Sequence, residues 1–166
     1  MNSHWYGDYV SGKVTPLYAF GHGLSFTQFE YADLQINRER ATSGESVEVS
    51  FKLMNCGPVA GDEVAQLYIR DEFASSPRPV KELKGYKRIC LQPGEKKMVT
   101  FHLPIDQLAF YDEELKLVVE PGEVEIMLGG SSEDIRLRGR IEITGEKNVF
   151  VKERVFVCPV EVEGSA

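Results

Sequence analysis

The sequence predicts an all-β fold, a two-sheet antiparallel β-sandwich that follows an irregular N-terminal segment. Apolar and polar residues alternate over several short stretches, as they do in strands with one buried face. Pro-Gly and Gly-Gly pairs separate these stretches, and no long segment has the apolar period of a helix. A sandwich of about 100 residues fits within the 166 residues of the chain.

The first strands are expected at residues 31–37 and 47–53, on either side of a turn at 42–45. In residues 47–53 the odd-numbered positions are apolar and the even-numbered positions are polar. The segment CGPVAG at 56–61 ends this strand, and residues 63–70 resume as the next, so that the two form a hairpin-like pair. The alternation there places Ala65, Leu67 and Ile69 on one face and Val64, Gln66 and Tyr68 on the other.

The second half repeats this pattern after a loop at 71–79, whose two prolines do not suit a central strand. Strands are expected at 81–91, 97–103, 108–111, 115–119, 123–128 and 135–143, and the motifs QPGE, DEE, PG and GGSS mark the turns. In 97–103, Val99, Phe101 and Leu103 oppose Met98, Thr100 and His102. Residues 150–163 form either an extra edge strand that Pro159 stops or a loose tail.

Composition excludes several classes of function. The net charge is −7, and Lys and Arg are dispersed among Asp and Glu, so the surface lacks the basic stripe of a nucleic-acid-binding protein. No apolar run approaches the roughly 20 residues that cross a bilayer, and residues 1–6 lack the pattern of an export signal. Three widely spaced cysteines form no zinc motif; their odd number weakly favours a cytoplasmic location over a secreted disulfide framework.

Several sequence blocks occur together in one order: LYAFGHGLSFTQF at 17–29, NCGPVAGDEVAQLY at 55–68, PVKELKGYKRICLQPGE at 79–95 and VEPGE at 119–123. In this order, the blocks resemble the C-terminal fibronectin type III-like domain of family 3 glycoside hydrolases. The resemblance covers residues 17–143. Two departures are Ala19, where the family usually has proline, and Cys56, where it usually has threonine or a similar small polar residue.

The resemblance implies three regions. Residues 1–28 are a leader, the remnant of the end of a preceding α/β sandwich domain; residues 29–144 are the fibronectin type III-like domain; and residues 145–166 are a C-terminal extension. It also implies a parent enzyme that is a retaining, exo-acting β-glucosidase or β-xylosidase with its aspartate nucleophile on a barrel domain. That barrel is not in this sequence, so the chain alone is expected to be inactive and to need no cofactor.

The leader is rich in aromatic residues and glycine without a strand or helix period. Such apolar area indicates either a surface that docks on the catalytic domains of the parent, in the same chain or in a separate one, or a segment folded back on the sandwich. The charged block at 78–88 serves either to dock a domain or to prevent edge-to-edge pairing. The candidate docking residues are Trp5, Tyr6, Tyr18, Phe20, Phe26, Phe29, Arg78, Lys81, Glu82 and Arg88.

Catalytic and metal-binding patterns are not found. Retaining hydrolysis needs two carboxyl groups about 5 Å apart, whereas the acidic pairs here fall in turns or on adjacent strand positions. The three histidines have unrelated spacings, and Ser131-Ser132 lacks a nucleophile-elbow context. A free-standing carbohydrate-binding or adhesion module is the alternative function, with stacking candidates Trp5, Tyr6, Tyr9, Tyr18, Tyr86 and Tyr111.

Overall fold

The computed structural model describes residues 16–71, 78–146 and 149–164 and confirms an all-β sandwich. Its elements, in chain order, are β1 (Phe29–Ile36), β2 (Arg40–Ala41), β3 (Ser46–Asn55), β4 (Gly61–Asp71), β5 (Glu82–Leu91), β6 (Lys96–Pro104), the 3₁₀ turn η1 (Ile105–Leu108), β7 (Phe110–Tyr111), β8 (Leu117–Val119), β9 (Gly122–Gly129), β10 (Ile135–Ile143), β11 (Val149–Phe150) and β12 (Val160–Gly164).

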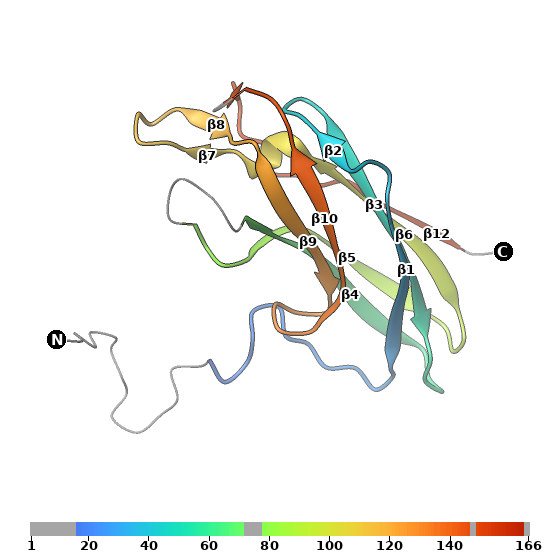
Figure 1. Ribbon diagram of the computed structural model, residues 1–166. Coiled ribbons are helices and arrows are strands. Elements are labelled where there is room, and N and C mark those ends of the chain that lie inside the picture. The colour runs from blue at the N-terminus through green and yellow to red at the C-terminus, as the bar shows by residue number, and fades with distance from the viewer. Residues whose placement is uncertain (1–15, 72–77, 147–148, 165–166) are drawn as a thin grey trace, which may run out of the picture.

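Two main sheets pack face to face, as Figure 1 shows. The first sheet has the order β1-β3-β6-β12, and the second has the order β2-β10-β9-β4-β5. All neighbours are antiparallel except the short pair of β2 with β10. A small sheet of order β11-β8-β7 lies at one end of the sandwich, and residues 16–28 run past the opposite end.

The core lies between the inward faces of the two main sheets. The apolar positions of 47–53 and 97–103 are buried as predicted, and so are Ala65, Leu67 and Ile69 of β4. The rings of Tyr31, Phe51 and Phe101 form a stack, with centroid separations of 5.3 and 6.3 Å. Period-two patterning therefore placed the inner face correctly, because only one side of each strand meets the opposite sheet.

The predicted hairpin of the strands at 47–53 and 63–70 is wrong. β3 pairs with β1 and β6, whereas β4 lies in the other sheet between β9 and β5. Asn55, which is fully buried, explains the crossing: its side chain donates to the carbonyls of Val59 (2.8 Å) and Leu91 (3.1 Å) and accepts from Gly57 N–H (3.1 Å). These bonds direct residues 56–60 from one sheet to the other.

The strands expected at 108–111 and 115–119 are shorter in the structure, because local hydrogen bonds form turns before each of them. Ile105–Leu108 forms a 3₁₀ turn in which Ala109 N–H donates to the Asp106 carbonyl, so the strand there is only Phe110–Tyr111. The Asp112 carboxylate accepts from the N–H groups of residues 114 and 116, which holds a turn up to β8. Leu115 has a φ of 60° in this turn and is exposed.

The C-terminal residues include an edge strand. β12 pairs with β6, and it begins immediately after Pro159 rather than ending at it. Proline has no N–H to donate to a ladder, and here its own carbonyl accepts from His102 N–H at 2.9 Å. Within the described ranges, the structure has no helix with the length and apolar character of a membrane span.

Candidate docking surface

The leader is attached to the outer face of β4 by two side chains that the sequence placed away from the core. Gln66 is 3% exposed and Tyr68 is 1% exposed. Gln66 Nε2 donates to the carbonyls of Gly21 (3.1 Å) and Gly130 (2.5 Å), while its Oε1 accepts from the Tyr68 hydroxyl (2.5 Å). The leader and the loop after β9 thus cover two polar side chains, and burial is tolerated because both are hydrogen-bonded.

Gly21 makes this close approach possible. Its φ is +78°, which side chains other than glycine rarely adopt. A Cβ atom there would lie 2.1 Å from Gln66 Oε1 and 2.9 Å from the Tyr68 hydroxyl. The neighbouring Phe20 carbonyl accepts from Ser132 N–H at 2.9 Å, which fixes the leader to the same loop. The first glycine of the FGHG sequence therefore has a defined steric role.

A second anchor holds the end of the leader. The Thr27 hydroxyl donates to Asn55 Oδ1 at 2.5 Å, and Cys56 N–H donates to the Gln28 carbonyl at 2.8 Å. The backbone of the leader is held at these two anchors, yet its large apolar side chains point into solvent. The exposed fractions run from 65% to 101% for Leu17, Tyr18, Phe20, Leu24 and Phe26.

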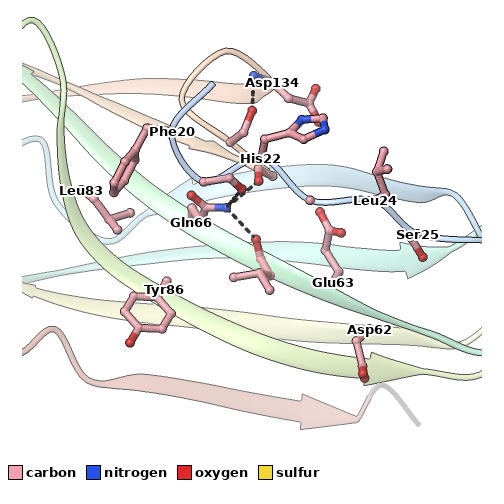
Figure 2. Close-up of a pocket in the computed structure, with 15 residues that line it drawn as sticks. Phe20, His22, Leu24, Ser25, Asp62, Glu63, Gln66, Leu83, Tyr86 and Asp134 are labelled. Atoms are coloured by element: carbon pink, nitrogen blue, oxygen red, sulfur yellow. Dashed lines mark hydrogen bonds between the residues drawn. The ribbon is translucent and has the colours of Figure 1, made fainter. Parts of the chain in front are cut away.

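A cleft of about 590 Å³ lies between this leader and strands β4 and β5. Residues 20–25 form one wall, and Val64, Leu83 and Tyr86 contribute apolar surface from the strands. A second hollow of about 720 Å³ adjoins it on the other side of Phe20 and reaches Val80. Figure 2 shows Gln66 and the carboxylate of Glu63 directed toward the leader, while Tyr86 and Asp62 lie on the opposite side of the view.

The charged side chains of the cleft differ in how they are compensated. Asp62 pairs with Arg88, whose hydrogen bond lowers the pKa of Asp62. Glu63 is half-buried and accepts a hydrogen bond from the Tyr31 hydroxyl at 2.7 Å. Burial raises the pKa of Glu63 despite this bond, with a further contribution from the negative charge of Asp134. Burial also raises the pKa of Tyr31, so the phenol stays protonated and remains a hydrogen-bond donor.

The remainder of the same sheet face has a different character. On β9 and β10, cross-strand ion pairs join Arg138 to Glu125 (2.7 Å) and Arg140 to Glu123 (2.8 Å). Such exposed pairs are solvated and contribute little binding surface. Among the described residues, the exposed large apolar side chains of this sheet are Val64 and Tyr86, and both lie beside the leader.

The comparisons with known proteins agree with this architecture. The fibronectin type III-like domain family matches residues 63–132. Thermostable beta-glucosidase B from Acetivibrio thermocellus is 42% identical over 92% of this chain and 20% of its own length, and a beta-xylosidase from Formosa agariphila is 45% identical over 76% of the chain and 17% of its own. The solved beta-glucosidase of Listeria innocua, in complex with glucose, superposes with a TM-score of 0.77 at 37% identity, over 86% of this chain and 20% of that one.

The chain belongs to the fibronectin type III-like domains of family 3 glycoside hydrolases. It spans about a fifth of the length of the curated relatives that it matches. In those relatives the domain is part of one longer polypeptide.

In this fibronectin type III-like domain, the structure brings some candidate docking residues together. Phe20 lies on the cleft, and Tyr18 stacks on His22 with ring centroids 5.1 Å apart. Lys81 bonds the Ser132 carbonyl and pairs with Glu133 at 3.2 Å beside the second hollow. Trp5 and Tyr6, together with the sugar-stacking candidate Tyr9, lie outside the described residues.

Other candidates are used inside the fold. The side chain of Arg78 is only 10% exposed; it pairs with Asp71 (3.3 Å) and Glu82 (3.0 Å), donates to the Leu108 carbonyl (3.0 Å) and lies over the Phe110 ring. Phe29 is half-buried against the core, as part of β1. Two candidates remain at the surface instead: Arg88 is exposed and pairs with Asp62, and Phe26 is fully exposed.

Glu82 connects Arg78 with a second buried cation. Lys84 pairs with Glu82 at 2.8 Å, and burial lowers the pKa of this lysine, which the pairing opposes. Because both cations are partnered internally, this part of the charged block orders the start of β5. The sequence left two roles open for the charged block at 78–88, which were docking and protection of a sheet edge. The structure adds a third, because Arg78 and Lys84 form ion pairs within the sandwich.

The roles of Gln66, Tyr68 and Glu63 were not predicted from the sequence. One pattern in the sequence could have indicated these roles. Gln66 and Tyr68 are large polar residues at the outward positions of a strand whose inward positions are all apolar. Outward Gln and Tyr side chains are ordinary on a solvated sheet face. Only the position of the leader shows that here they are buried and hold a neighbouring segment. Among the described residues no group of three potential metal ligands is found.

Proposed function

We propose that this chain is a non-catalytic accessory module of a family 3 β-glycosidase, and that it docks on the catalytic domains and stabilises them. The leader supports this more than any other feature, because its backbone is fixed at two anchors while its large apolar side chains face solvent. Ordered, exposed apolar surface is typical of an interface whose partner is missing. We propose that the parent hydrolyses terminal β-glucosides or β-xylosides, as the names of its relatives suggest.

The test uses the beta-glucosidase of Acetivibrio thermocellus as a host. One form lacks the fifth of the enzyme that this chain matches; a second carries this chain in its place. We expect the shortened enzyme to lose thermal stability and β-glucoside hydrolysis, and the chimera to recover both. A shortened enzyme as stable and as active as the intact one would contradict a stabilising role.

The isolated chain tests the absence of catalysis. We expect no turnover of chromogenic β-glucosides or β-xylosides, because retaining hydrolysis requires an opposed carboxyl pair that flanks the substrate. Activity that disappears in Glu63→Gln or Asp112→Asn would place a catalytic carboxylate on this sandwich and refute the accessory role. Activity that survives in both variants would indicate a contaminating enzyme.

A carbohydrate-binding module is the second candidate. The observation in its favour is Tyr86, which is 67% exposed on the cleft beside carboxylates, since sugar rings stack on exposed aromatic faces. Tyr111 is less suited, because Arg154 lies 6.0 Å from the centre of its ring. Retardation of the chain in a native gel containing soluble polysaccharide, lost in Tyr86→Ala, would favour this candidate over docking.

A further inference from the structure

The cleft combines apolar walls with one carboxylate, Glu63, that has no ion pair among the described residues. Phe20 and Leu24 of the leader face it from one side, and Val64, Leu83 and Tyr86 line it from the strands. All but Leu83 are exposed to solvent. A group that enters this cleft therefore removes apolar surface from water, which favours binding.

Three carboxylates border the cleft, and two of them already have cations. Asp62 pairs with Arg88, and Asp134 pairs with Arg136 at 2.6 Å. Across residues 16–71, 78–146 and 149–164, no basic side chain comes within ion-pair distance of Glu63. Its side-chain hydrogen bond comes from the neutral Tyr31 hydroxyl, and the charge of Arg136 lowers the pKa of Glu63 only from beyond ion-pair distance, so burial prevails.

This arrangement costs the isolated chain stability. Glu63 faces Tyr31 of β1, Asp134 and Arg136 beside the loop after β9, and His22 of the leader. Burial holds the pKa of Glu63 above its ordinary value of 4.5. A carboxyl group whose pKa is raised by folding contributes stability below the unfolded value and loses it as the pH rises through the folded value. At neutral pH, Glu63 is thus a charge that an external cation would stabilise.

We propose that the cleft receives an arginine side chain, with apolar residues on either side of it, from the catalytic domains, and that its guanidinium pairs with Glu63. This inference rests on the proposed docking function. Arginine fits better than lysine because its planar head is weakly hydrated and binds a carboxylate with two parallel hydrogen bonds.

The first test uses a small probe on the isolated chain. The peptide acetyl-Leu-Arg-Leu-amide and its Gln counterpart are titrated while amide NMR signals of the cleft, such as Val64 and Gly130, are followed. We expect only the Arg peptide to shift them and Glu63→Gln to weaken its binding about tenfold, equivalent to about 1.4 kcal/mol. Glu142→Gln removes the same charge from an exposed position paired with Arg40 and should leave binding unchanged.

Three results would overturn the proposal. Equal shifts with both peptides would mean that the cleft recognises apolar groups alone. Equal binding by the chain and Glu63→Gln would remove the carboxylate from recognition. Shifts of the same amides with cellobiose or xylobiose, but not with the Arg peptide, would assign the cleft to carbohydrate.

The second test compares the isolated chain with the chimeric enzyme. In the isolated chain Glu63→Gln should raise Tm at neutral pH and have no effect below pH 4.5, because glutamine keeps an acceptor for Tyr31 and removes the buried charge. In the chimera the same substitution should lower Tm. A change of the same sign in both proteins would refute the arginine pairing alone, whereas a chimera no better than the shortened enzyme would refute docking itself.

Discussion

Replacement of Gly21 by alanine is the sharpest test of how the leader is held. Gly21 has a φ of +78°, and a Cβ would lie 2.1 Å from Gln66 Oε1. Gln66 has little freedom to withdraw, because Gly130 and Tyr68 hold both ends of its amide. We therefore expect the substitution to detach residues 19–22 from β4 rather than to move Gln66.

The magnitude follows from the contacts that detachment removes. Release of residues 19–22 relieves the strain of an alanine in the left-handed region, about 1–2 kcal/mol, so this strain does not add to the loss. Detachment removes the hydrogen bonds that the carbonyls of Gly21 and Phe20 accept from Gln66 and Ser132, each of which contributes about 1 kcal/mol. The free energy of unfolding should fall by about 1–3 kcal/mol.

Urea denaturation measures this loss, and amide exchange locates it. Ser132 N–H should exchange faster in Gly21→Ala, because its acceptor is the Phe20 carbonyl. Gly23→Ala is a matched control, since a Cβ there meets no atom within 4 Å, and it should change the free energy of unfolding by less than about 0.5 kcal/mol. Equal effects of the two substitutions, or unchanged exchange at Ser132, would show that the leader is not held as described.

Three further outcomes are expected. Asn55→Ala should lower the free energy of unfolding by about 2–4 kcal/mol in urea titrations, because it removes the hydrogen-bond donor of the Leu91 carbonyl, which is buried, and of the Val59 carbonyl, which is partly buried; a loss below about 1 kcal/mol would mean that water replaces the amide. Arg78→Ala should cost about 2–4 kcal/mol, and Arg88→Ala should lower Tm far less, as thermal melts would show, since only the first arginine is enclosed; similar losses would contradict that difference. Burial raises the pKa of Cys158 to about 12, so in the native chain a thiol reagent at neutral pH should label the two exposed cysteines and reach Cys158 only on unfolding. Rapid labelling of all three would be inconsistent with a closed core at that position.

The sequence predicted the inward faces of the strands better than the connections between them. Alternation in 47–53 and 97–103 determines which side chains are buried, because a slip of one residue would expose the whole apolar set. It carries no information on which sheet a strand joins. The crossing after β3 depends on Asn55, and one buried amide among ordinary turn residues is not distinctive in a sequence.

The docking candidates show the same limit for charged residues. Arg78 and Arg88 both occur in one charged block, and nothing in their spacing separates an enclosed arginine from an exposed one. The difference arises from the 3₁₀ turn and β7, which bring the Leu108 carbonyl and the Phe110 ring to Arg78. Contacts between segments some 30 residues apart are set by the tertiary fold rather than by local pattern.

The position of Tyr31 provides a spectroscopic signal for binding in the cleft. Its ring lies almost parallel to that of Phe51 in the core, with an angle of 4°, while its hydroxyl donates to Glu63 at the cleft. A ligand that draws the carboxylate away would change both the hydrogen bond of this phenol and its asymmetric environment. Near-ultraviolet circular dichroism of the unlabelled chain would then record occupancy of the cleft, and the part of the change that Tyr31→Phe lacks would come from this phenol.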